Sequence, residues 1–259
     1  MILEKLAEAS RYRVEKRKVR KSPELLRREA ESMGRENGFP FEAALRKPDL
    51  SFICEVKKAS PSKGVLAPEF PYLQIASEYE EAGADAVSCL TEPEYFQGSD
   101  RYLKEIAGKS SIPVLRKDFT VDPYMIYEAK VLGASAVLLI CALLDRGEIR
   151  EGIQIADSLG MSALVEAHDE EEVEKALDAG ARIIGVNNRD LRTFQVNLDN
   201  SRRLRRLVPS EILFVSESGI RTSEDIRRLR ENGTDAVLIG ETLMKRPDKK
   251  KALRELKGI

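Results

Sequence analysis

The sequence contains a single histidine, His168, no tryptophan and three cysteines in 259 residues. One imidazole excludes a zinc site built from several histidines, and a Ser-His-Asp triad would depend on His168 alone. We interpret His168, which stands beside Asp169 at a predicted helix start, as a surface residue. Cys54, Cys89 and Cys141 are widely separated among apolar residues, which is typical of reduced, buried thiols in a cytoplasmic protein.

The chain also lacks a long apolar stretch and a strong net charge. Its longest apolar run, residues 134–144, is shorter than the ~20 residues that span a bilayer. The first residues, MILEKLAEAS, carry no signal-peptide pattern, so we expect neither secretion nor a membrane partner. With 43 Lys and Arg against 44 Asp and Glu, no overall field attracts nucleic acid, and an anionic ligand needs a local site.

What the sequence does contain, from Phe52 onward, is an alternation of short apolar runs with segments of helical period. The runs are rich in Val, Ile and Leu and number eight: 52–57, 85–90, 112–119, 135–140, 162–167, 182–188, 212–218 and 235–240. The pattern predicts βα units and a parallel sheet, because each interval leaves room for a helix. Since no further domain remains, a closed (β/α)8 TIM barrel of the α/β class is favoured over an open doubly wound sheet.

Two charged helical stretches, residues 2–21 and 23–33, precede this alternation. We therefore predict a single barrel domain over residues 1–259, in which residues 1–50 form an N-terminal helical extension. The extension contains the basic run EKRKVRK, which would suit a nucleic-acid arm. On a helix of mixed charge we interpret this run as a solvated face instead.

Polar residues interrupt the apolar pattern at the carboxyl ends of the predicted strands, where barrel enzymes bind their ligands. They are Glu55, Lys57, Lys117, Glu166, Asn187 and Glu217. Because side chains alternate along a strand, Lys117 shares a face with Leu115 and points inward, and the other charged residues follow the same rule. Removing such charges from water is costly, so the pattern favours an acid-base active site. Salt bridges at the barrel mouth, or charges that face the helices, are the alternatives.

Two segments with glycine, SESGI and LIGE, end the seventh and eighth predicted strands, where barrels commonly bind phosphate. The backbone N–H groups of Ser218, Gly219, Gly240 and Glu241 are placed to donate to an anion at a helix entrance. The Glu241 carboxylate should then turn away from the ligand. Either glycine is equally compatible with an ordinary turn.

The loop after the first predicted strand, KASPSKG, contains Ser60 and Lys63. Its composition is compatible with a lid that closes over an anionic substrate. It is equally compatible with a plain mobile loop.

In these segments the sequence resembles the indole-3-glycerol phosphate synthase family. The resemblance covers nearly the whole chain, including the helical extension, and although one motif is weak, the ordered set is highly specific. The motifs are EVKKASPSKG from Glu55, LTEPEYFQGSD from Leu90, LRKDF from Leu115, LVEAH from Leu164, IGVNNRDLRTF from Ile184, SESGI from Ser216 and VLIGETLM from Val237.

The resemblance implies a carboxy-lyase that converts 1-(2-carboxyphenylamino)-1-deoxyribulose 5-phosphate into indole-3-glycerol phosphate in tryptophan biosynthesis. Carbon dioxide and water leave, and neither a metal nor an organic cofactor takes part. An aromatic carbon attacks a ketone, so an ammonium acid has to protonate the developing alkoxide. The expected partner is a phosphorylated small molecule. We expect a monomer, and association with other enzymes of the tryptophan pathway stays open.

By the same resemblance, Lys117 is the acid of ring closure, Lys57 holds the substrate carboxylate and assists dehydration, and Glu166 is the base. Glu55 orients the substrate or is a second proton carrier. The remaining residues contact the sugar hydroxyls (Asn187, Glu217 and Ser218), the substrate carboxylate (Arg189), the aromatic ring (Phe96 and Phe119) and the phosphate (Ser60, Gly219 and Gly240). Coupled charges leave the division of labour between the lysines and among the glutamates open.

Other classes of protein stay open beside this one. A sugar-phosphate isomerase or a Schiff-base aldolase that uses Lys57 or Lys117 would also need a phosphate-binding barrel. Borohydride trapping distinguishes the aldolase. A noncatalytic sugar-phosphate sensor is the third alternative, and the intact set of lysines and glutamates argues against it.

Overall fold

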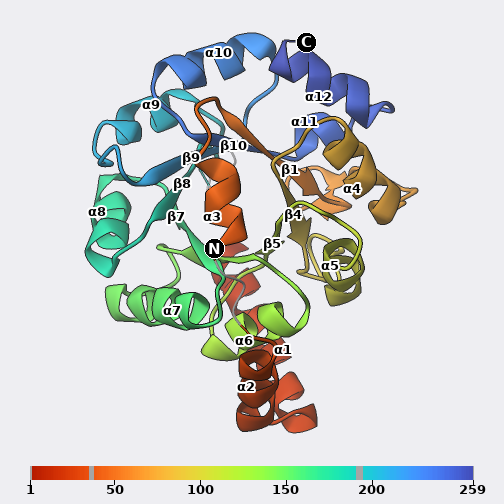
Figure 1. Cartoon of the computed structure of the whole chain (residues 1–259), viewed down its shortest axis with the longest axis vertical. Coiled ribbons are helices and arrows are strands. Elements are labelled where there is room, and N and C mark those ends of the chain that lie inside the picture. Colours follow the sequence, from red (N-terminus) through yellow and green to blue (C-terminus); the bar gives the residue numbers. More distant parts are fainter. Residues whose placement is uncertain (1, 35–37, 191–194, 259) are drawn as a thin grey trace.

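The computed structural model describes residues 2–34, 38–190 and 195–258. In these ranges, eight parallel strands close into a barrel in the order β1-β10-β9-β8-β7-β6-β5-β4 (Figure 1). The predicted barrel is therefore confirmed, and every strand lies within two residues of its expected bounds. The strands are β1 (Ser51–Val56), β4 (Ala86–Leu90), β5 (Val114–Lys117), β6 (Ala136–Ile140), β7 (Ser162–Ala167), β8 (Ile183–Asn187), β9 (Leu213–Glu217) and β10 (Ala236–Ile239).

Helices follow the strands and cover the outside of the barrel (Figure 1). Several begin at a side-chain cap: Thr222 and Asp225 form a capping box at α10, and Asp169 caps α8. In the described ranges, no helix combines the length and apolarity that a membrane crossing needs. The helices are α4 (Tyr72–Glu81), α5 (Asp100–Ala107), α6 (Pro123–Val131), α7 (Arg146–Ser158), α8 (Glu170–Ala179), α9 (Asp199–Arg205), α10 (Ser223–Glu231), α11 (Glu241–Met244) and α12 (Lys249–Lys257).

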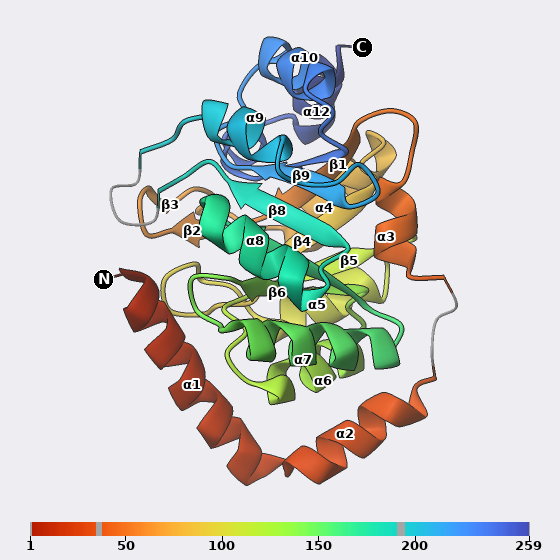
Figure 2. The ribbon, with the colours of Figure 1, turned by 90° about the vertical axis from the view of Figure 1, so that its left-hand side faces the viewer.

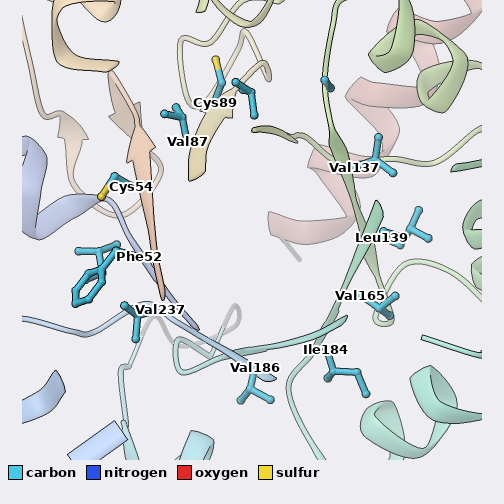
Figure 3. Packing of buried hydrophobic residues seen from close by; sticks show 14 of the residues in the cluster. Phe52, Cys54, Val87, Cys89, Val137, Leu139, Val165, Ile184, Val186 and Val237 are labelled. Carbon is cyan, nitrogen blue, oxygen red and sulfur yellow. The ribbon is translucent and has the colours of Figure 1, made fainter. Parts of the chain in front are cut away.

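The alternation of side chains along each strand divides the core into two apolar layers. Residues such as Val87, Leu139 and Val165 point away from the barrel axis and pack against the helices (Figure 3). Residues of the other parity, among them Leu115 and Leu164, fill the interior. The inward direction that we predicted for the charged residues is confirmed, because they continue this inner face at the carboxyl ends of the strands.

The two ends of the barrel are closed differently (Figure 2). At the amino ends of the strands, α3 (Pro40–Leu45) inserts Phe41 and Leu45 into the interior cluster. At the other end lies an antiparallel hairpin of β2 (Ala59–Ser60) and β3 (Gly64–Val65). The KASPSKG loop is therefore a hairpin over the carboxyl end, and Gly64 adopts the positive φ of 66° that its turn requires.

The N-terminal extension consists of α1 (Ile2–Arg20) and α2 (Pro23–Ser32), which form a bent arm along the barrel (Figure 2). The extension was predicted, but the solvated-face interpretation of its basic run is wrong in part. Arg17 pairs with Glu128, and the Lys18 ammonium lies 2.7 Å from the Asp122 carboxylate. These ion pairs fix α1 to α6 and its N-cap, so part of the basic run packs α1 against the barrel.

Candidate active site

A cavity of about 540 Å³ opens at the carboxyl ends of the barrel strands, a size typical of small-molecule sites. All the residues predicted for the site lie in its lining. They are Glu55, Lys57, Ser60, Phe96, Lys117, Phe119, Glu166, Asn187, Arg189, Glu217, Ser218, Gly219, Gly240 and Glu241. The structure therefore brings together side chains that are up to 186 positions apart in the chain, from Glu55 to Glu241.

Lys117, at the end of β5, is the central cation of the cavity. Its Nζ atom lies 2.9 Å from Glu166 Oε2 and 3.3 Å from Glu217 Oε2. Burial lowers the pKa of this ammonium, but the charges of Glu166, Glu217 and Glu55 outweigh burial and raise the pKa above its usual value. Lys117 is therefore protonated in the free protein, as an acid must be.

The two carboxylates beside Lys117 have pKa values pushed in opposite directions. Burial raises the pKa of Glu166, but Lys117 and His168 outweigh it and lower the pKa to about 2. For Glu217, burial together with the charge of Glu166 outweighs Lys117 and raises the pKa to about 7. Two buried carboxylates share one ammonium, so a proton is held far more readily by one of them than by the other. Such separated pKa values suit general acid-base chemistry.

Two glycines make room for carboxylates of the site. Glu55 on β1 accepts a hydrogen bond from Lys57, two residues along the same face. A Cβ atom added to Gly240 would collide with Glu55 Oε1, and one added to Gly185 would collide with Glu217 Oε1. Gly240 directly follows β10, which pairs with β1, and Gly185 lies on β8, which pairs with β9. Glycine at these two positions is therefore a condition for both carboxylates to point inward. The sequence indicated Gly240 for the phosphate side, not for its contact with Glu55, and contained no signal for Gly185.

The phosphate side predicted from the sequence has the backbone geometry of an anion site. Ser218 (φ 67°) and Gly219 (φ 83°) are consecutive residues in the left-handed region. A Cβ atom at Gly219 would also collide with Val196 Cγ1, so only glycine fits there. Gly240 precedes the short helix α11, and residues of both loops line the same cavity.

The Glu241 carboxylate is held by two cations. It lies 2.6 Å from the Lys245 ammonium and 3.3 Å from the Arg189 guanidinium. Burial raises the pKa of Glu241, but these cations and Lys63 outweigh it and lower the pKa. Lys245, and Arg221 on the neighbouring loop, line the cavity and were missed by the sequence analysis. Lys245 is four residues from Glu241 on one helix face, which was the signal available.

An apolar wall lies at the other side of the cavity. The rings of Phe96 and Phe119 are 6.0 Å apart between centroids, in a tilted arrangement. Glu92, which is fully buried, accepts the backbone N–H of Phe96 at 2.9 Å and so fixes this loop. Leu3 and Leu6 of α1 complete the lining, a contribution that no local pattern indicated.

Asn187, at the end of β8, connects Glu166 to the loop that follows. Its amide donates to Glu166 Oε1 at 3.3 Å, and its Oδ1 accepts the Arg189 N–H at 3.0 Å. The motif IGVNNRDLRTF continues from here, and its residues 191–194 lie outside the described residues.

The interpretation of His168 as a surface residue is wrong. Only 18% of its side chain is exposed, and its ring lies against Glu166 of the cavity. The chain turns from β7 into α8 at this point, so the His168 ring lies between Glu166 on β7 and Glu172 on α8. A sequence pattern that places His168 next to a helix start does not reveal this packing.

Ionisable side chains gathered at the carboxyl end of a closed (β/α)8 barrel, facing loops shaped for an anion, define a barrel enzyme with an acid-base site. Comparison with known proteins identifies which one. The sequence model of indole-3-glycerol phosphate synthase matches residues 3–256, so the chain belongs to the indole-3-glycerol phosphate synthase family.

Relatives of known name support this assignment over the full length. The indole-3-glycerol phosphate synthase of Ruminiclostridium cellulolyticum is 58% identical over 258 residues, which cover 100% of this chain and 99% of the relative. That of Endomicrobium trichonymphae is 56% identical over 257 residues, covering 99% and 100%.

Solved structures of more distant proteins show the same fold. Thiamine phosphate pyrophosphorylase from Pyrococcus furiosus has a TM-score of 0.60 at 20% identity, covering 81% of this chain and 94% of its own. A 3-hexulose-6-phosphate synthase has a TM-score of 0.63 at 15% identity, covering 81% and 99%. At such identities the likeness concerns the fold alone.

Proposed function

We propose that the protein closes the indole ring of 1-(2-carboxyphenylamino)-1-deoxyribulose 5-phosphate, releasing carbon dioxide and water to give indole-3-glycerol phosphate. The observation that carries this proposal is the position of Lys117 between Glu166 and Glu217, in a cavity with an anion-binding side and an aromatic wall. Membership of the family makes the reaction a step of tryptophan biosynthesis.

The substrate binds with its two ends at opposite sides of the cavity. Ser60 and the N–H groups of Gly219, Gly240 and Glu241 hold the phosphate, which the left-handed backbone at Ser218 and Gly219 supports. Phe96 and Phe119 flank the aromatic ring. Lys57 and Arg189 hold the substrate carboxylate.

Lys117 acts first. As the ring carbon attacks the ketone, the ammonium transfers a proton to the developing alkoxide, which becomes a hydroxyl. The ring then loses its carboxylate as carbon dioxide, and the bonding electrons return to the ring. The closely spaced carboxylates keep Lys117 charged until the substrate arrives, so the proton is available when the alkoxide forms.

Dehydration follows, with a second acid and a base. Lys57 protonates the departing hydroxyl, which leaves as water, and Glu166 takes the proton that the ring loses. Once Lys117 has given up its proton, Glu166 loses a counter-charge, so its pKa rises and it becomes a better base for this step. Glu55 orients Lys57, while Asn187, Glu217 and Ser218 position the sugar hydroxyls. The net reaction consumes one proton.

The remaining expectations are proposals of the same kind. Residues 1–259 form one domain that unfolds cooperatively, and the protein is a cytoplasmic monomer that uses no metal or organic cofactor. A single coincident unfolding transition in circular dichroism and fluorescence would support the single domain. Sedimentation equilibrium would test whether the protein is a monomer.

The test is to supply the carboxyphenylamino deoxyribulose phosphate and follow indole fluorescence. We expect the indole product, followed by its fluorescence, and carbon dioxide to form in equal molar amounts. We also expect the activity to survive dialysis against a chelator. Borohydride in the presence of a ketose phosphate should leave the protein mass unchanged. Substrate binding without carbon dioxide release, or a stable mass adduct on a lysine, would contradict the proposal.

A further inference from the structure

The ring of His168 lies between a carboxylate of the cavity and a carboxylate outside it. Its Nδ1 atom is 3.0 Å from Glu172 Oε2 on α8, and its Nε2 atom is 3.5 Å from Glu166 Oε1 on β7. Nε2 is buried and makes no hydrogen bond to any of the described residues. A protonated ring would direct this N–H group at the Glu166 carboxylate, which accounts for an otherwise unpaired buried nitrogen.

Hydrogen bonds to the backbone and to the ring fix the position of His168. The Glu172 carboxylate that contacts the ring also accepts the backbone N–H of His168 at 2.8 Å. From α9, the Asn200 amide donates to the His168 carbonyl at 3.0 Å. Asp169, the next residue, caps α8 by accepting the Glu172 N–H at 2.9 Å. The backbone and the ring of His168 are therefore held in a fixed position relative to Glu166.

The charged groups that face the ring are carboxylates: Glu166 from β7, Glu172 from α8 and Glu217 from β9. Burial lowers the pKa of His168, but the hydrogen bond to Glu172 and these negative charges outweigh burial and raise the pKa above its usual value. The ring is thus suited to carry a positive charge at neutral pH.

Lys117 and Lys175 contact groups other than the His168 ring. Lys117 pairs with Glu166 and Glu217 inside the cavity. Lys175, on α8, donates to backbone carbonyls of the segment after β6. Glu166 therefore contacts two different groups, Lys117 through Oε2 and the His168 ring, which is outside the cavity lining, through Oε1.

We propose that His168 is a positioning residue that, as an imidazolium held by Glu172, keeps Glu166 ionised and oriented throughout the reaction. The inference rests on the proposed role of Glu166 as base. When Lys117 transfers its proton to the substrate, Glu166 loses one counter-charge, and His168 supplies the one that remains. Without it, Glu166 would turn away or take up a proton from another source before dehydration.

The single histidine makes a direct test feasible, because all imidazole signals in a nuclear magnetic resonance spectrum come from His168. We expect its titration midpoint to lie above 6.5 in the unaltered protein. Glu166→Gln and Glu172→Gln should each lower the midpoint by about one pH unit, since each removes a facing charge. Glu171→Gln, an exposed neighbour on the same helix turn, is the matched control and should leave it unchanged. A midpoint that ignores Glu166→Gln would overturn the proposal.

Kinetics provide the second test. His168→Gln replaces the ring N–H donor with an amide N–H donor and removes the charge. We therefore expect kcat to fall about tenfold with little change in KM, and the acidic limb of the kcat profile to move up by about one pH unit. Glu172→Gln should move the limb in the same direction by less. Circular dichroism checks whether His168→Gln folds. If it does not fold, Glu172→Gln alone provides the kinetic test.

A merely structural role predicts a different result, namely an equal loss of kcat at every pH with an unmoved limb, and that result would refute the proposal. An unchanged kcat would refute it as well. If the unaltered protein does not turn over the substrate at all, the proposed function fails, while the histidine titrations still decide whether His168 and Glu166 are coupled.

Discussion

Arg116 and Lys117 are neighbours on β5, and they point to opposite faces of the barrel wall. Both are cations surrounded by carboxylates, and in both the surrounding charges raise the pKa. Arg116, which is 1% exposed, contacts Glu128 at 2.8 Å and Asp100 at 3.0 Å behind the barrel. Lys117 faces the cavity.

The two clusters differ in completeness. Arg116 also donates to the Thr91 hydroxyl and to the Met125 carbonyl, so each nitrogen of its guanidinium has a partner. Arginines of α1 pair with Asp100, Glu128 and Asp118 of the same cluster. The Lys117 cluster contains an oxygen, Glu217 Oε1, that is buried and has no partner among the described residues. A perturbed pKa therefore does not by itself indicate an active site. An incomplete network beside a cavity does.

The largest expected difference between the clusters is in turnover. Lys117→Met should lower kcat by at least about 1,000-fold, because the proton donor to the alkoxide is gone, while binding of a substrate analogue stays within about threefold. Steady-state kinetics and calorimetry measure the two quantities. Lys104→Met, at an exposed position of α5, is the control. Near-normal turnover in Lys117→Met would remove its assignment as the acid.

Arg116→Met should act on stability instead. Its removal leaves the buried Asp118 and the partly buried Glu128 with fewer counter-charges, which should lower the free energy of unfolding by about 3–5 kcal/mol. Urea unfolding measures this change, and Arg101→Met, at an exposed site, should change it little. The distinction between a stabilising Arg116 and a Lys117 that acts in turnover would be wrong if Arg116→Met lowered kcat as much as Lys117→Met and left the stability unchanged.

Gly185→Ala sharpens the comparison from the side of the carboxylates. The new Cβ atom collides with Glu217 Oε1, so the carboxylate has to move away from Lys117. A displacement of this kind costs roughly 100-fold in kcat. Gly147→Ala, at the start of α7, adds the same atom far from the cavity and should leave kcat unchanged. Equal kcat values in the two variants would mean that the position of Glu217 does not matter.

The smallest expected effect concerns the pH dependence of stability. Because folding raises the pKa of Glu217 to about 7, the folded state binds this proton more tightly than the unfolded state. The contribution to stability is complete below the ordinary pKa of about 4.5 and is lost as the pH rises through about 7.

Glu217→Gln should remove this dependence. Between pH 4.5 and pH 8 the variant should lose roughly 3 kcal/mol less stability than the unaltered protein, measured by urea unfolding at each pH. Parallel stability curves would show that Glu217 is ionised in the folded state at neutral pH, which would remove the asymmetry between Glu166 and Glu217.

Much of the fold and of the site followed from local patterns. The eight apolar runs predicted the barrel, and the polar residues that end them, such as Lys117 and Glu166, lie in the cavity as expected. Features without a local signal were missed or misinterpreted. Arg17 was assigned to a solvated face and pairs with the barrel, and the ring of His168 contacts Glu166. The resemblance to a known family supplied the roles of the site residues, which spacing alone left open.

The sequence by itself determined the alternation of strands and helices and the inward direction of Lys117 and Glu166, because both follow from the period of side chains along one element. Only the tertiary structure decided which cation is enclosed, as Arg116 is, and which faces a cavity, as Lys117 does. That distinction depends on contacts between residues distant in the chain. The free energy of a buried charge is set by all its neighbours at once, and no local pattern contains them.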